Sequence, residues 1–261
     1  MSSRASSSHA ADAGAFFDGR AERYDRAYDA PGSDGYALRS RMEAVLRLVG
    51  AGPGEILDIG MGPGRLLVEL ERRGWDVSGV DASTAMVMRA RQRLPRAAER
   101  IIEGEMESLP VSDASFDSVV ATGVLEYAEI ESAIREIARV LRPGGVAVVS
   151  YPNPSAYYVV WKTHVWYRSI RAARRLLGRP QPRVSQGSHL VTIPRLRALM
   201  GEAGLHVVAT EYTCYLVIPS PADYLLPQTT ERLGRWLERN AMRRAGRLSC
   251  QVVLRFEKAT S

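Results

Sequence analysis

The most constraining feature of this sequence is an apolar strand that runs through three glycines directly into a helix. Residues 56–70 read ILDIGMGPGRLLVEL, with Gly60, Gly62 and Gly64 at the junction. Glycine permits a tight turn and, because it lacks a Cβ, lets a ligand approach the backbone. Such a unit predicts a parallel sheet with a binding site at its first strand-to-helix turn.

Short strands and helices alternate through the rest of the first 152 residues. Strands are expected at residues 55–60, 76–82, 101–105, 116–123 and 145–152, with helices near 64–73, 84–94 and 130–141 between them. Two further helices are expected upstream, within residues 15–30 and at 35–49. This alternation indicates βαβ units and a parallel sheet covered by helices on both faces.

The pattern changes after residue 152. Helices are expected at residues 155–178, 194–203 and 229–244, and strands at 206–212 and 249–256 that pair antiparallel at the sheet edge. The predicted fold class is α/β: a doubly wound, mostly parallel seven-stranded sheet with helical insertions after strand 5 and between strands 6 and 7. We divide the chain into a disordered tail (1–14), a ligand-binding core (15–152) and a region (153–261) that completes the sheet and forms the substrate side.

Charge is divided unevenly along the chain. The net charge of +6 combines −5 for residues 1–150 with +11 for residues 151–261. The basic part fits an anionic substrate, an anionic membrane or nucleic acid. No apolar run approaches the ~18–20 residues that span a bilayer, and no apolar segment near the start resembles a secretory signal. Two cysteines, too few for a disulfide framework or a zinc cluster, favour a cytoplasmic location.

The spacing of the glycines excludes two common nucleotide sites. Arg65 occupies the position where a dinucleotide fingerprint needs its third glycine, and no Lys-Ser/Thr pair follows, as a triphosphate loop requires. Asp81 ends the second strand, where a carboxylate can accept hydrogen bonds from both hydroxyls of a ribose. Glu105 is placed to accept from an adenine amino group, with the Met106 amide facing a ring nitrogen.

These residues resemble the class I S-adenosylmethionine-dependent methyltransferases. Six motifs occur in that family's order: the glycine turn, Asp81, GEMESLP followed by FD (104–117), VLEY (124–127), LRPGG (141–145) and FDGRAERYD (17–25). The resemblance covers residues 15–152. It implies a Rossmann-like core and S-adenosylmethionine as cofactor. A divalent cation is compatible with the chemistry, but no residue cluster indicates a metal site.

The resemblance also implies roles for individual residues. Gly60, Gly62 and Gly64 would pass under the methionine part of the cofactor, and Asp58 would orient the turn or the cofactor's amino group. Asp81 would hold the ribose, while Glu105 and Met106 read the adenine. The remaining cofactor-binding residues implied are Tyr24, Ala82, Met86, Thr122 and Gly123. For Met86, ordinary core packing is an equal alternative.

The acceptor is less constrained. VLEY and residues 186–205 resemble the ubiquinone-biosynthesis O-methyltransferases, although Tyr127 replaces the histidine of their L-E-H signature. His189 is the candidate general base, with Glu126 as its partner or as a ligand of a divalent ion; for each, a structural hydrogen bond is the alternative. We expect O-methylation of a hydroxyl on a hydrophobic or anionic small molecule. The alternatives are N- or C-methylation, or a non-catalytic cofactor-binding subunit.

Two segments combine aromatic residues with arginine, at residues 155–179 and 229–247. They fit a lid over a lipophilic substrate, peripheral contact with a membrane surface, or a solvated basic face over an apolar core. Nucleic acid is disfavoured as a partner, because the chain lacks a recognised RNA-binding module and the Pro-Pro-Tyr motif of amino-methylating enzymes. Nothing in the sequence indicates an oligomeric state.

Overall fold

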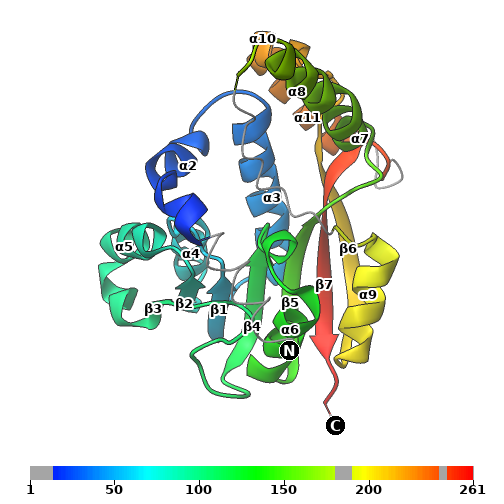
Figure 1. The fold of residues 1–261 in the computed structure, drawn as a ribbon. Helices are drawn as coiled ribbons and strands as arrows, with labels where there is room; N and C mark the ends of the chain where they lie inside the picture. The colour runs from blue at the N-terminus through cyan, green and yellow to red at the C-terminus, as the bar shows by residue number, and fades with distance from the viewer. Residues whose placement is uncertain (1–13, 180–189, 241–245, 261) are drawn as a thin grey trace, which may run out of the picture.

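A computed structural model describes residues 14–179, 190–240 and 246–260. Seven strands form one sheet in the order β3-β2-β1-β4-β5-β7-β6 (Figure 1). Their bounds are β1 Glu55–Ile59, β2 Asp76–Asp81, β3 Ile101–Glu103, β4 Phe116–Thr122, β5 Leu141–Pro152, β6 Leu205–Tyr215 and β7 Ser249–Lys258. Strands β1 to β5 are parallel, whereas β7 pairs antiparallel with both β5 and β6. The predicted fold class and the antiparallel edge are confirmed.

Helices cover both faces of the sheet. On one face lie α3 (Ser33–Val49), α4 (Arg65–Arg72) and α5 (Thr84–Arg93), and on the other α6 (Ile130–Val140) and α9 (Ile193–Glu202). Buried strand side chains alternate between the two cores: Ile56 faces the first and Leu57 the second. Because successive side chains of a strand point to opposite faces, an apolar run such as ILDI is what a strand buried on both sides requires.

The strand order indicates where on the sheet a ligand would bind. Strands β1 and β4 are neighbours, and the connections leading away from them run in opposite directions across the sheet. In doubly wound folds, a crevice opens at this switch point beyond the carboxyl ends of the strands. The short 3₁₀ helix η2 (Leu125–Tyr127) follows β4 at this end, whereas η1 (Pro95–Arg100) precedes β3 at the other end of the strands.

The remaining helices lie at one end of the molecule, at the top of Figure 1. Helix α7 (Tyr157–Trp161) continues through the π-helix η3 (Lys162–Trp166) into α8 (Tyr167–Leu176), which matches the long helix predicted there. Helix α10 (Ala222–Leu225), which was not predicted, precedes α11 (Pro227–Asn240). We call α7, η3, α8, α10 and α11 the distal helices. In the described ranges, no helix is both long and apolar enough to cross a membrane.

Candidate active site

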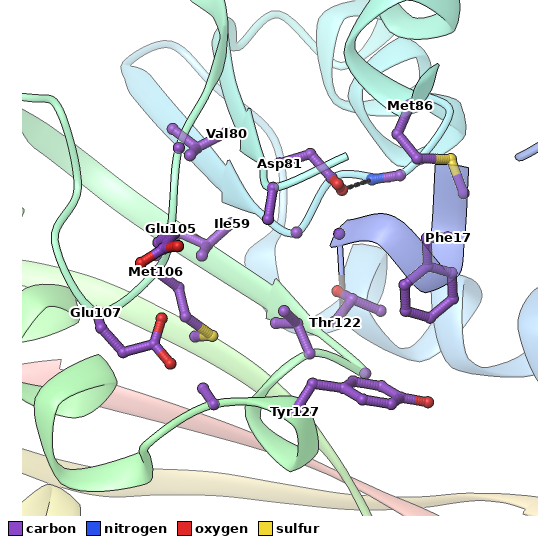
Figure 2. Close-up of a pocket in the computed structure, with 18 of the residues that line it drawn as sticks. Phe17, Ile59, Val80, Asp81, Met86, Glu105, Met106, Glu107, Thr122 and Tyr127 are labelled. Carbon is purple, nitrogen blue, oxygen red and sulfur yellow. Dashed lines mark hydrogen bonds between the residues drawn. The ribbon is translucent and has the colours of Figure 1, made fainter. Parts of the chain in front are cut away.

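A pocket of about 720 Å³, part of it open to solvent, lies where β1, β2 and β4 end (Figure 2). Ten of the twelve residues expected at the cofactor line this pocket: Tyr24, Gly60, Gly62, Asp81, Ala82, Met86, Glu105, Met106, Thr122 and Gly123. The other two, Asp58 and Gly64, lie behind its wall. The structure therefore gathers most of the predicted residues around one cavity.

The glycine turn forms the floor of the pocket. Gly60 and Gly62 have φ angles of +68° and +56°, a region that side-chain-bearing residues rarely adopt. A Cβ on Gly60 would lie 2.6 Å from a Val124 methyl group, so only glycine fits beside the β4 loop. Gly64 has a packing role instead. A Cβ on this residue would lie only 3.0 Å from the Cβ of Ala90 in α5. Gly64 permits close packing of α5 and does not face the cavity.

Asp81 joins the two loops that frame the pocket. Its Oδ2 accepts a hydrogen bond from the Gly62 amide at 2.8 Å, and its Oδ1 accepts one from the Ser83 amide at 2.9 Å. Burial raises the pKa of this carboxyl, and the two amide hydrogen bonds oppose that rise. Each carboxylate oxygen can accept further hydrogen bonds, so Asp81 still has capacity for hydroxyl groups in the cavity.

Arg41 of α3 lies behind the pocket wall, close enough to Asp58 and Glu126 to act on both carboxyl groups electrostatically. Burial raises the pKa values of Asp58 and Glu126, and the nearby Arg41 guanidinium lowers both. Within the described residues, neither carboxylate oxygen of Asp58 has a hydrogen-bond partner, nor do Glu126 Oε2 and Arg41 Nε. A Cβ on Gly123 would collide with the Arg41 guanidinium. Buried polar atoms that have no hydrogen-bond partner among the described residues therefore lie close to the pocket lining.

Arg41 was missed by the sequence analysis, although a signal was present. It falls in the apolar stripe of its helix, three residues after Leu38 and four before Val45, and it is buried. A charged side chain on a buried helix face needs partners or a function.

Of the expected catalytic pair, the structure describes Glu126 alone. Glu126 lies in η2 but does not line the pocket. His189 lies outside the described residues, so its pairing with Glu126 stays a prediction.

Other residues occupy the part of the pocket near the β4 loop. Phe17 and Tyr127 meet edge-to-face with ring centroids 5.5 Å apart, and Phe17 meets Tyr24 in the same way at 5.9 Å. In Figure 2, Glu107 lies at the left of the view near Met106, whereas Phe17 and Tyr127 lie toward the right. Glu107 Oε1 accepts from the Glu129 amide at 3.0 Å, while Oε2 is buried and, in the described residues, without a partner. Burial raises the pKa values of Glu107 and Tyr127.

The segment that covers the pocket is held by two aspartates. Residues 14–18 are helical, and α2 (Ala21–Ala27) follows. Asp18 accepts from the Ser83 hydroxyl at 2.6 Å and from the Ala85 amide at 3.0 Å, at the start of α5. Asp25 binds Arg65 at 2.7 Å and Arg93 at 2.8 Å. We call residues 14–28 the N-terminal lid, because Gly14, Phe17 and Tyr24 line the cavity from this side.

Among the residues that the structure describes, no group of three or more His, Cys, Asp or Glu side chains is arranged to hold a metal ion.

Comparison with known proteins identifies the family. A family model described as a methyltransferase domain matches residues 57–149. The chain is 32% identical over 196 residues to a demethylmenaquinone methyltransferase of Mycolicibacterium paratuberculosis, covering 72% of this chain and 81% of that protein.

Solved structures share the fold. A Haloferax volcanii methyltransferase complex with the Trm112 activator matches with a TM-score of 0.64 and 22% identity, covering 94% of this chain and 98% of that chain. The geranyl diphosphate C-methyltransferase of Streptomyces coelicolor, bound to S-adenosyl-L-homocysteine, matches with a TM-score of 0.55 and 17% identity over 84% and 78% of the two chains. The glycine turn, the strand order and these relatives agree, and the chain belongs to the S-adenosylmethionine-dependent methyltransferases.

Proposed function

We propose that the nucleoside part of S-adenosylmethionine lies between Asp81 and the loop of Glu105 and Met106. Each carboxylate oxygen of Asp81 accepts one backbone hydrogen bond and can accept another from a ribose hydroxyl. Glu105 and the Met106 amide line the same cavity and would face the adenine edge. Met86 is almost fully buried and also lines the pocket, so it both packs in the core and would contact the ring.

For the amino-acid end of the cofactor, we propose Arg41 and Asp58 as the charged partners. A zwitterion carries one carboxylate and one ammonium group, and the wall beside Gly60 and Gly123 has one buried cation and one buried carboxyl behind it. The unpartnered Arg41 Nε and Asp58 oxygens support this assignment, because buried polar groups are normally hydrogen-bonded.

We further propose that the acceptor is a hydroxylated, largely apolar molecule and that the hydroxyl oxygen receives the methyl group. S-adenosylmethionine supplies a methyl group on a positively charged sulfur, so the acceptor must present an electron pair in line with it. The observation that carries this proposal is the Glu107 carboxyl, which lines the pocket and whose buried Oε2 has no hydrogen-bond partner among the described residues. A carboxyl whose pKa is raised by burial is a better proton acceptor at neutral pH.

Glu107 would take the hydroxyl proton, while Phe17 and Tyr127 hold a flat acceptor by their rings. Tyr127 itself stays protonated at neutral pH, because burial raises its pKa; it can donate a hydrogen bond but not act as the base. His189 is the rival base, and Glu126 is its proposed partner.

A second candidate is methylation of a ring carbon in a quinone-derived acceptor. The relatives named demethylmenaquinone methyltransferase favour this acceptor class. Loss of a phenolic proton also makes the adjacent ring carbons nucleophilic, so the same base serves both reactions.

The test is incubation of the purified protein with methyl-labelled S-adenosylmethionine and a panel of phenols, naphthols and hydroquinones. Products with the label in an O-methyl group would support the proposal. Label bound to ring carbon would establish the second candidate instead, and label only on nitrogen acceptors would contradict both. Matching each phenol with its ready-made methyl ether is the control, because the ether has no proton for Glu107 to remove.

A further inference from the structure

The distal helices expose most of the large apolar side chains that lie at the surface of the described residues. Leu176 and Leu177, at the end of α8, are 88% and 67% exposed, and Leu225 at the end of α10 is 76% exposed. None of the residues of α8 is buried against the described part of the chain. Large exposed apolar side chains gathered on one group of helices indicate a surface for association.

The same helices carry an excess of positive charge. No aspartate or glutamate occurs in residues 137–201, and Arg168, Arg175 and Arg179 are exposed around α8. On α11, Arg232, Trp236 and Arg239 are spaced by four and three residues, so they share one exposed face.

The two glutamates of α11 do not offset this charge. Glu231 pairs with Arg39 at 2.8 Å and with Arg235 at 3.2 Å. Glu238 is directed toward the sheet, where it accepts hydrogen bonds from Thr213 and the Cys214 amide. The outward faces of the distal helices are therefore cationic as well as apolar.

We propose that the distal helices dock the protein on an anionic lipid surface. An amphipathic helix with leucines and arginines lies in the headgroup region, where the apolar side chains enter the acyl boundary and the guanidinium groups meet lipid phosphates. Trp236, flanked by two arginines, fits the same interface. A nucleic-acid surface fits less well, because single-strand binding uses stacked aromatic rings and leaves Leu176, Leu177 and Leu225 without a role.

The test is flotation of the full-length protein with vesicles made of equal parts phosphatidylglycerol and phosphatidylcholine. We expect the protein to float with these vesicles at low salt, to detach at high salt, and to ignore pure phosphatidylcholine vesicles. Replacing two arginines, Arg168→Gln with Arg175→Gln, should weaken partitioning roughly tenfold to thirtyfold. The pair Leu176→Ala with Leu177→Ala should weaken it by at least about tenfold.

Matched controls come from the rest of the surface. The pair Arg72→Gln with Arg96→Gln removes the same charge elsewhere, and Val207→Ala with Val208→Ala trims exposed side chains on β6; neither should change partitioning. Unchanged thermal unfolding and S-adenosylmethionine affinity would show that the variants fold. The proposal is overturned if the wild type stays with the soluble fraction, if the control pairs weaken flotation as much as the α8 pairs, or if RNA rather than vesicles is bound. Flotation needs no turnover, so its result is independent of the acceptor proposed above.

Discussion

Arg41 lies directly behind Gly123, so closely that a Cβ on residue 123 would collide with its guanidinium. Gly123 directly follows β4 and lines the pocket, and its φ is +66°. Position 123 in the pocket wall must therefore be glycine to leave room for the buried Arg41 guanidinium. This relationship gives two of the predictions below.

Replacing Gly123 should damage both stability and cofactor binding. Gly123→Ala imposes a side chain on a left-handed backbone and pushes Arg41 aside, so we expect a loss of at least about 1–3 kcal/mol in unfolding free energy. S-adenosylmethionine affinity, measured by calorimetry, should fall with it. Gly74→Ala is the matched control, because Gly74 has φ +87° but open space around it. Equal losses in the two variants would show that the collision with Arg41 contributes nothing.

Removing the Arg41 charge should weaken binding of the amino-acid end of the cofactor and leave binding of its nucleoside end nearly unchanged. We expect Arg41→Met to weaken S-adenosylmethionine binding about tenfold or more, because a charge-assisted hydrogen bond to the carboxylate is lost. Affinity for methylthioadenosine, which has no amino-acid group, should change little. Arg47→Met, on the same helix but at the surface, is the control. If both ligands lose affinity equally, Arg41 supports the wall rather than the carboxylate.

The lid should loosen when Asp25 loses its charge. Asp25→Asn weakens the contacts with Arg65 and Arg93, and we expect a loss of about 2 kcal/mol in stability together with faster cofactor dissociation in stopped-flow experiments. Asp29→Asn is the control: Asp29 also binds Arg65 but is exposed, so it should have little effect. An unchanged dissociation rate in Asp25→Asn would show that the lid does not control exchange.

The Asp25 contribution should also depend on pH. Burial raises the pKa of Asp25, but hydrogen bonds from Arg65 and Arg93 outweigh it and hold the pKa below its usual value of 3.8. For a group with a depressed folded-state pKa, stability is fully present above the unfolded pKa and is lost as pH falls through the folded pKa. The difference in Tm between wild type and Asp25→Asn should therefore be constant near neutral pH and shrink below about pH 4.

Glu107 should define the acid limb of the activity profile. Burial raises its pKa above the usual 4.5, so kcat/KM should fall as pH drops through that raised value and the base becomes protonated. Glu107→Gln should lower kcat by about 10²–10⁴ and remove this limb, while S-adenosylmethionine affinity stays close to wild type. Glu103→Gln, outside the pocket, is the control. If the acid limb persists in Glu107→Gln and disappears only in His189→Ala, His189 is the base.

The regular part of the fold could be predicted from the sequence because its signals are local. Short apolar runs between helical segments located every strand, although β5 begins at Leu141 rather than near 145, and β6 extends to Tyr215. Helix α10 has only four residues, too few for a periodic pattern. Arg41 was missed although its position in the apolar stripe of α3 is a local signal of burial. Glu107 was missed for a different reason: its environment is made by segments distant in the sequence, and no spacing along the chain reports burial of this kind.

The position of β7 has a consequence for how the protein folds. Strand β7 lies between β5 and β6, so the hydrogen-bonding edge of β5 stays unpaired until residues 249–258 have been synthesised. During that interval a growing chain presents an open, apolar strand, the kind of surface through which nascent proteins associate wrongly. Expression yield should therefore be more sensitive to substitutions in β7 than to substitutions of equal size in β3, the edge strand beside β2.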